Sequence, residues 1–243
     1  MNFKTLVLTI ILSLSTVVAN AFDHSKFDLI LKTYVKDGFV EYTKLKESKE
    51  DLAKFRSYLK ELNSAKVGNL EENEKLAFWI NAYNAYTIEL ILTHLPVSSI
   101  KKIGNLINGP WDQNICKVGG ETYTLNHIEH KILRVDFKEP RIHFAIVCAS
   151  ISCPKLLSTA FTAKNVEELL DVAGSDFIND SSKNIFDAKE GVFKTSKIFS
   201  WFGEDFESMG GAIGVWNKYT KSNQISKDSD IDFMDYDWGL NGK

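Results

Sequence analysis

The segment that most constrains the fold is ENEKLAFWINAYNAYTIELILTHLP, which runs from Glu72 to Pro96. Its apolar residues lie nearly all round a helix, and the proline ends that helix. A helix that is apolar on every side must be covered on every side. We therefore expect a long, mostly buried helix with other elements packed around it.

Two polar residues interrupt this helix near its middle. Asn81 and Asn84 are three residues apart and so lie on one face. A buried amide without a hydrogen bond costs about 1–3 kcal/mol. Two interpretations are open: the pair lines a pocket or orients a loop, or it ties down the backbone of a long loop that crosses the helix.

Apolar residues at helical spacing predict further helices before and after this segment. They are Phe27, Ile30, Leu31 and Val35, then Leu52, Phe55, Leu59 and Leu62, and finally Val166, Leu169, Leu170, Ala173 and Phe177, with a break at 36–40. Period-2 alternation from Arg141 to Cys148 predicts a central strand, and residues 184–202 predict a hairpin. We expect one α+β domain, residues 22–243, with helices packed around a small, mostly antiparallel sheet.

The first residues have the layout of a secretory signal peptide. MNFKTLVLTIILSLSTVVANAF has a lysine at position 4, an apolar run from Leu6, and small residues Ala19 and Ala21. The run is shorter than the roughly 20 apolar residues of a spanning helix. We predict that residues 1–21 are cleaved off after Ala21, that the mature chain does not span a membrane, and that it is periplasmic or secreted.

The charge balance argues against one class of partner. The chain has 29 lysines and arginines against 32 aspartates and glutamates, a net charge of −3, and loss of Lys4 with the signal peptide changes this to −4. No basic cluster is present to neutralise phosphates, so we expect no nucleic-acid partner.

The cysteines Cys116, Cys148 and Cys153 have to be read together, because exported proteins usually pair their cysteines. The single pairings open to them are Cys116 with Cys148, Cys116 with Cys153, and Cys148 with Cys153. The last would close a small turn and gain little loop entropy. Only the first leaves Cys153 free.

Cys153 also has the surroundings of a nucleophile. It directly precedes Pro154, which is favoured at the first position of a helix, so we expect a helix over 154–160 with the thiol at its positive N-terminus. His130 or His143 would be its general base, oriented by a carboxylate or amide such as Glu129 or Asn84. Glu129 has a competing interpretation, because Asn126 and Glu129 have the spacing of a capping box.

Other motifs predict structure more than chemistry. His127 and His130 are a weak metal signal without a third ligand, and neither HExxH nor paired CxxC is present, so we predict no metal and no cofactor. Trp201 and Phe202 are typical core aromatics. The acidic tail KDSDIDFMDYDWGLN lacks the glycine and glutamate of a calcium loop, and we expect a solvated tail packed down by Phe233, Tyr236 and Trp238.

The stretches FWINAYNAY, LNHIEHKILR, PRIHFAIVCASISCPKL, SKIFSWFGEDF and IDFMDYDWGLNG, in this order, resemble the DUF547 family, a domain of unknown function common in exported bacterial proteins. The family pattern includes residues that correspond to Asn81, Tyr83, Asn84, Glu129, His130, Arg141, His143, Cys153, Pro154, Trp201 and Trp238. It favours His130 over His127 and Cys153 over Cys116. A cysteine that opens a helix is also similar to papain-like and transglutaminase-like enzymes, although papain's histidine follows its cysteine.

Together these features favour a thiol-dependent hydrolase or acyl transferase that acts on a peptide or small amide in the cell envelope. Cys153 would be the nucleophile, His130 or His143 the base, and Glu129 and Asn84 the orienting groups. The alternative is a non-catalytic extracytoplasmic module that binds a peptide, glycan or partner protein and has structural cysteines. A third hypothesis is a metal site formed by His130, His143 and a cysteine.

Overall fold

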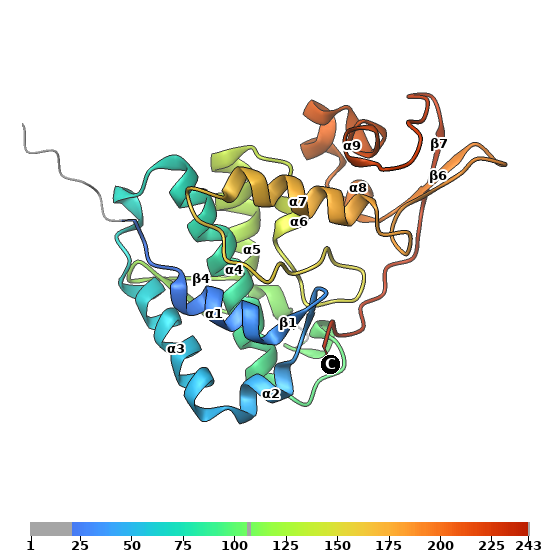
Figure 1. Ribbon diagram of the computed structural model, residues 1–243. Coiled ribbons are helices and arrows are strands. Elements are labelled where there is room, and N and C mark those ends of the chain that lie inside the picture. Colours follow the sequence, from blue (N-terminus) through green and yellow to red (C-terminus); the bar gives the residue numbers. More distant parts are fainter. Residues whose placement is uncertain (1–20, 106–107, 243) are drawn as a thin grey trace, which may run out of the picture.

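The computed structural model describes residues 21–105 and 108–242, and Figure 1 shows their arrangement. Of the predicted signal peptide, residues 1–20 lie outside the described residues. Within the described part of the chain, no helix combines the length and the apolar character that crossing a membrane requires.

Helices joined by short strands form most of the fold. The α-helices are α1 (Ser25–Tyr34), α2 (Tyr42–Glu47), α3 (Lys49–Ser64), α4 (Glu72–His94), α5 (Leu125–His127), α6 (Ile142–Ala145), α7 (Val166–Ile178), α8 (Ile198–Trp201) and α9 (Gly211–Tyr219). The π-helix η4 (Ile128–Phe137) continues α5, and short 3-10 helices are η1 (Val67–Asn69), η2 (Ile100–Lys102), η3 (Pro110–Asp112) and η5 (Gly203–Met209). The strands are β1 (Val35–Lys36), β2 (Phe39–Val40), β3 (Cys116–Val118), β4 (Glu121–Tyr123), β5 (Ile185–Asp187), β6 (Val192–Thr195) and β7 (Asp230–Phe233).

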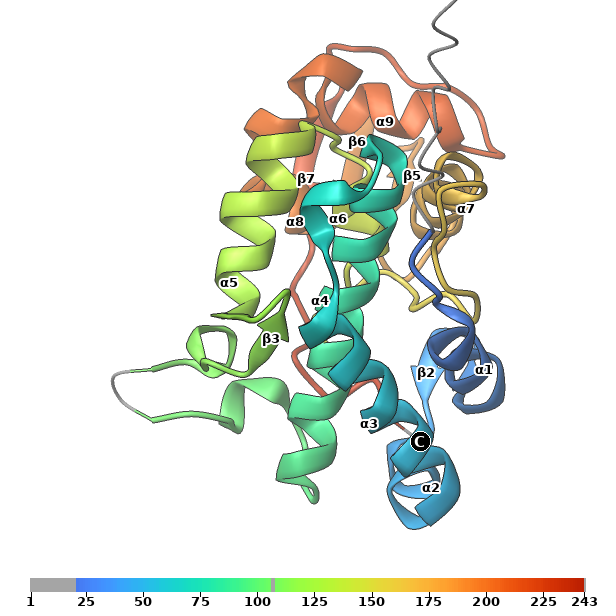
Figure 2. The ribbon, with the colours of Figure 1, turned by 90° about the vertical axis from the view of Figure 1, so that its left-hand side faces the viewer.

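The long apolar segment forms α4, the central helix of the fold. It contacts α2, α3, α5, α7, β3 and η4, and Figure 2 shows it between the α5–η4 helix and α7. Phe78, Ile80 and Ile91 are fully buried, and burial of each such side chain contributes about 1.5–3 kcal/mol. The predicted helix is confirmed, since α4 ends at His94, just before Pro96.

Asn81 and Asn84 both hold the backbone of segments that cross α4. Asn81 accepts a hydrogen bond from the N–H of Phe161 at 3.0 Å and donates to its carbonyl at 2.7 Å. Asn84 donates to the carbonyl of Ala145 and accepts from the N–H of Val147, both at 2.9 Å. Tying down a crossing chain is therefore confirmed for both, and Asn84 holds the segment that leads into the cysteine loop.

The sheets are small and mostly antiparallel. β1 pairs with β2 and β3 with β4 as antiparallel hairpins, while β6 pairs antiparallel with β5 and parallel with β7. The predicted break at 36–40 is the β1–β2 turn, where Asp37 and Gly38 have φ of 53° and 83°. The predicted hairpin is β5–β6. The mixed class, with helices and small sheets, is confirmed.

The predicted central strand from Arg141 to Cys148 is wrong. Residues Ile142–Ala145 form the short helix α6, and the chain becomes extended only from Ile146. Ile142 and Ala145 pack in the main cluster around α4, whereas Phe144 packs in a second cluster with Phe177 and Phe206. α6 lies between the two clusters, so side chains on both sides of this helical turn are buried. The same burial on two faces is expected of a central strand, and this explains why the sequence pattern predicted one.

The predicted helix at 154–160 is also wrong, since the chain has no helical turn there. Pro154 has no N–H, and the end of the segment is bound to other helices. Asp28 of α1 accepts from the N–H of Ala160 at 3.0 Å, and Asn81 of α4 holds Phe161. These long-range hydrogen bonds hold an irregular segment in place of a helix, so Cys153 does not lie at a helix N-terminus.

Candidate functional site

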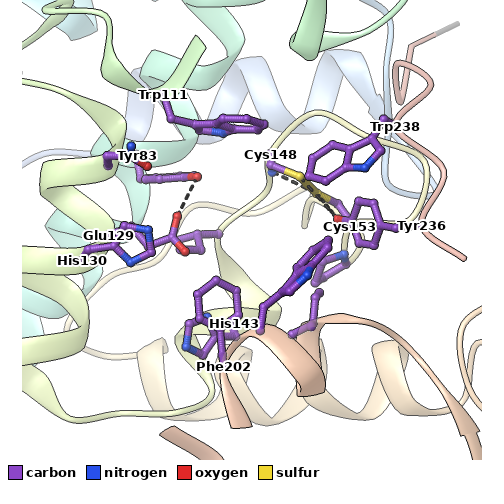
Figure 3. A pocket seen from close by; sticks show the side chains of 15 residues that line it. Tyr83, Trp111, Glu129, His130, His143, Cys148, Cys153, Phe202, Tyr236 and Trp238 are labelled. Carbon is purple, nitrogen blue, oxygen red and sulfur yellow. Dashed lines mark hydrogen bonds between the residues drawn. A yellow bond between two sulfur atoms is a disulfide. The ribbon is translucent and has the colours of Figure 1, made fainter. Parts of the chain in front are cut away.

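A pocket of about 210 Å³ lies between the two hydrophobic clusters, with its lining residues drawn in Figure 3. Its aromatic lining consists of Tyr83, Trp111, Trp201, Phe202, Tyr236 and Trp238, and its other lining residues are Asn126, Glu129, His130, His143, Ile146, Cys148, Cys153, Pro154 and Ile198. An engineered cavity of roughly 150 Å³ accepts a benzene ring. The pocket therefore has room for one side chain or one acyl group.

Cys148 and Cys153 form a disulfide at this pocket. Within the described residues Cys116 is buried and forms no disulfide. Of the three pairings left open by the sequence, the structure has the third. The pairing of Cys116 with Cys148, which would have left Cys153 free, is wrong.

The loop between the two cysteines is held from both sides. Asn84 of α4 binds the backbone just before it, and the C-terminal tail binds the loop itself: the N–H of Ile151 donates to the carbonyl of Gly239 at 2.8 Å. Ala149 adopts a left-handed conformation, with φ of 58°. A non-glycine residue is strained there by about 1–3 kcal/mol and persists only because its surroundings impose it. The tail contacts thus fix the position of both sulfur atoms.

Hydrogen-bond donors gather around Sγ of Cys153. The backbone N–H of Cys148 donates to it at 3.0 Å, and the hydroxyls of Ser150 and Tyr236 each lie 3.3 Å from it. Burial raises the pKa of Tyr236 to about 12, so its hydroxyl keeps its proton at neutral pH. Once the disulfide is reduced, donors in these positions favour a thiolate over a thiol. The predicted helix N-terminus was expected to have this effect.

Glu129 places a buried carboxyl group in the pocket. Its Oε2 accepts a hydrogen bond from the hydroxyl of Tyr83 at 3.0 Å. Burial raises the pKa of Glu129 from 4.5 to about 7, against the lowering effects of Tyr83 and Arg134. The capping-box interpretation is wrong, because the helix is capped by Thr124, whose hydroxyl accepts from the N–H of His127 at 3.0 Å. Glu129 is therefore available for chemistry near neutral pH.

His130 and His143 belong to one charged network centred on Asp205. His143 Nε2 donates to Asp205 at 2.6 Å, and Arg134 donates to both carboxylate oxygens at 2.6 and 2.8 Å. These hydrogen bonds hold the pKa of Asp205 well below its usual range. Arg134 also lies 3.1 Å from Nδ1 of His130. Because a guanidinium only donates, that nitrogen is the acceptor.

Both imidazoles favour the neutral form. Burial lowers the pKa of His143, and the hydrogen bond to Asp205 opposes this. Burial and the neighbouring Arg134 lower the pKa of His130. The ring of His143 stacks on Phe202 with 4.0 Å between centroids. A neutral, oriented imidazole beside a carboxylate is the arrangement that general bases use.

The C-terminal tail builds one wall of the pocket. Trp238 stacks on Trp201 with 5.7 Å between centroids, and Tyr236 contacts both rings. Trp201 is 45% exposed, so the interpretation of Trp201 as a core aromatic is wrong. The expected packing of the tail is correct for Tyr236 and Trp238. It is wrong for Phe233, which is 39% exposed.

The structure brings together most of the predicted site. Glu129, His130, His143 and Cys153 all line the pocket, whereas Asn84 does not and instead orients backbone. Asp205 was missed: it lies in the SKIFSWFGEDF motif, but an acidic residue in a turn gives no local sign of its partner. Within residues 21–105 and 108–242, no group of three or more His, Cys, Asp and Glu side chains is arranged to hold a metal ion.

Several residues of the family pattern meet at the same place. Tyr83, Pro154 and Trp201 line the pocket beside the residues already named. Tyr83 is buried in the core, and its hydroxyl donates a hydrogen bond to Glu129. Arg141 lies elsewhere, where it forms ion pairs with Glu139, Glu167 and Asp171.

Comparison with known proteins gives one match. The family model described as "Protein of unknown function, DUF547" matches residues 67–178. The matched residues run from η1 to the end of α7 and include Tyr83, Glu129, His130, His143 and both cysteines of the disulfide. The search of curated proteins and the search of solved structures find no match.

Proposed function

We propose that this chain is a thiol-dependent hydrolase or acyl transferase that acts on an amide or peptide, with Cys153 as its nucleophile. The observation that carries the proposal is the set of donors around Sγ of Cys153, inside an aromatic pocket that also contains Glu129. An attacking sulfur needs a stabilised thiolate, room for a substrate group and a nearby acid or base.

The disulfide makes this a resting form that reduction activates. A dithiol donor supplies two electrons and two protons, becomes a disulfide itself, and breaks the bond between Cys148 and Cys153. The thiolate of Cys153 then attacks the carbonyl carbon of the amide. The C–N bond breaks, a thioester forms on Sγ, and the amine leaves with a proton. Water, or an acceptor amine or alcohol, next attacks the thioester and regenerates the thiolate.

Glu129 is the best candidate for moving these protons. Its pKa of about 7 allows it to protonate the leaving amine and to accept a proton from the second nucleophile. The sequence predicts Glu129 as a group that orients a histidine base, whereas the proposal gives Glu129 the role of acid and base. His143, held by Asp205, is the alternative base. His130, bound to Arg134, supports the same network.

The pocket restricts the substrate class. The planar surfaces of Trp111, Trp201 and Trp238 suit an aromatic or other flat apolar group next to the scissile bond. The volume of about 210 Å³ suits a single such group rather than a long chain. We place the reaction in the cell envelope, because the predicted signal peptide would export the chain.

Differential alkylation tests the proposal. Purified mature protein is treated with iodoacetamide from pH 5 to 10, before and after mild reduction, and each cysteine is mapped by mass spectrometry. Cys153 should react only after reduction, with an apparent pKa well below the roughly 8.5 of an ordinary thiol. In Cys148→Ala it should react without reduction, and this variant should hydrolyse peptide 4-nitroanilides without a reductant.

Cys116→Ala is the matched control, since it removes a buried thiol outside the pocket and should leave the labelling of Cys153 unchanged. If the disulfide resists mild reduction in the native protein, or if Cys153 of Cys148→Ala labels like an ordinary thiol, the nucleophile assignment is wrong.

The disulfide and the aromatic lining also favour a second candidate, a non-catalytic binding module in which Cys148 and Cys153 are a structural staple. In that case aromatic peptides or glycans should quench tryptophan fluorescence with the disulfide intact, and the reduced protein should hydrolyse no peptide 4-nitroanilide. The hydrolase proposal instead expects hydrolysis in reductant that Cys153→Ala abolishes.

A further inference from the structure

The first described residues pack into an aromatic cluster whose members do not line the pocket. The ring of Phe22 lies 4.9 Å from the ring of Phe78 and 4.9 Å from that of His24, measured between centroids. His24 is buried, and Nδ1 lies 2.8 Å from the hydroxyl of Tyr58. Burial lowers the pKa of His24 to about 4, so the imidazole is neutral and carries no charge into this cluster.

The carboxylate of Glu74 faces the start of this segment. Glu74 lies in the first turn of α4 and is only 7% exposed, and its Oε1 accepts a hydrogen bond from the backbone nitrogen of Phe22. Among the described residues, no lysine, arginine or histidine side chain forms an ion pair with Glu74. A buried carboxylate is costly unless a cation or several donors compensate it, and a single amide N–H does so incompletely.

The chain passes from an exposed residue to packed residues at the bond between Ala21 and Phe22. Ala21 is exposed, whereas the residues that follow are tied to the fold through Phe22 and His24. The packed part of the chain therefore begins at the Ala21–Phe22 bond. The small residues Ala19 and Ala21 also make this the cleavage position expected from the sequence.

We propose that hydrolysis of the Ala21–Phe22 bond creates the cation that Glu74 is positioned to bind. Water adds its hydroxyl to the carbonyl of Ala21, and the nitrogen of Phe22 becomes an α-ammonium group with three N–H donors. The buried carboxylate then has a charged partner at the position already occupied by the amide. Maturation thereby completes an ion pair between the new N-terminus and α4 and stabilises the mature form specifically.

A double-mutant cycle tests the pair. One form begins at Phe22, and the other retains Asn20 and Ala21 before Phe22, each with Glu74 or with Glu74→Gln. Since about 2–4 °C of Tm corresponds to 1 kcal/mol in a chain of this size, we expect Glu74→Gln to lower the Tm of the Phe22 form by about 3 °C more than that of the extended form. Glu72→Gln, an exposed change in the same turn, should affect both forms equally.

N-terminal sequencing of the exported protein is the second measurement. It should begin at Phe22. A different first residue, or an equal loss of Tm from Glu74→Gln in both forms, would overturn the proposal. Neither result depends on the thiol chemistry proposed for Cys153.

Discussion

Cys116 and Cys153 are both buried, with 0% and 4% of their surface exposed, yet their surroundings differ. Cys116 lies in the β3–β4 hairpin, where burial raises the pKa of its thiol well above the usual range. Cys153 is bonded to Cys148 in the disulfide, and the N–H of Cys148 and nearby hydroxyls are directed at its sulfur. Two sulfur atoms of similar burial thus have different neighbours, and the proposed difference in reactivity rests on those neighbours rather than on burial.

The largest expected effect separates the two cysteines by function. Cys153→Ala should abolish hydrolysis by the reduced protein, a loss of at least about 10³-fold, because the proposed thioester forms on Sγ of Cys153. It should keep the Tm of the reduced wild type within a few degrees. Cys116→Ala should keep full turnover and lose about 2–4 °C of Tm, since it removes a packed buried sulfur.

Turnover of peptide 4-nitroanilides and thermal melts, both in reductant, measure this contrast. If Cys153→Ala keeps full activity, or if it unfolds, Cys153 is not the nucleophile and the two cysteines do not differ in the proposed way.

The second effect concerns Glu129, the proposed acid–base group that lines the same pocket as Cys153. Glu129→Gln keeps an acceptor for the hydroxyl of Tyr83 but cannot carry a proton between groups. We expect turnover to fall by about 10²–10⁴-fold with iodoacetamide labelling of Cys153 nearly unchanged. If His143 is the base instead, Glu129→Gln will cost less than tenfold and His143→Gln will cause the larger loss.

The sequence predicts a structural feature well when neighbouring residues determine it, and poorly when residues distant in the chain determine it. The burial of α4 follows from periodicity, and the cost of an unpaired amide predicts that Asn81 and Asn84 are hydrogen-bonded, but it did not decide between a pocket and a crossing chain. Glu129, His130, His143 and Cys153 line one pocket, and their catalytic roles stay a prediction.

The errors arise where distant segments impose the local structure. Residues 142–145 form a helix between two cores, and residues 154–160 stay irregular because α1 and α4 bind the end of that segment. Asp205 and Tyr236 reach the site only through the tertiary fold. No local pattern marks such partners.

A third prediction uses the raised pKa of Glu129 to measure its burial. The folded state keeps the proton between pH 4.5 and about 7, where the unfolded chain releases it. Wild-type stability should therefore decline across this range as the pH rises, by up to about 3 kcal/mol. Glu129→Gln removes this dependence, so its Tm relative to wild type should rise by several degrees from pH 5 to pH 8. A difference in Tm between the two proteins that stays constant from pH 5 to pH 8 would show that Glu129 ionises as an ordinary carboxyl.

The smallest effect sharpens the comparison at a single atom. Tyr236→Phe removes the hydroxyl that lies 3.3 Å from Sγ of Cys153 and leaves the ring contacts with Trp201 and Trp238 in place. Losing one donor should raise the apparent pKa of Cys153, measured by iodoacetamide labelling of the reduced protein, by about 0.5–1 unit. Tyr123→Phe, next to Cys116 in the hairpin register, should leave that pKa unchanged. An unchanged pKa in Tyr236→Phe would assign the stabilisation of the thiolate to the N–H of Cys148 and the hydroxyl of Ser150.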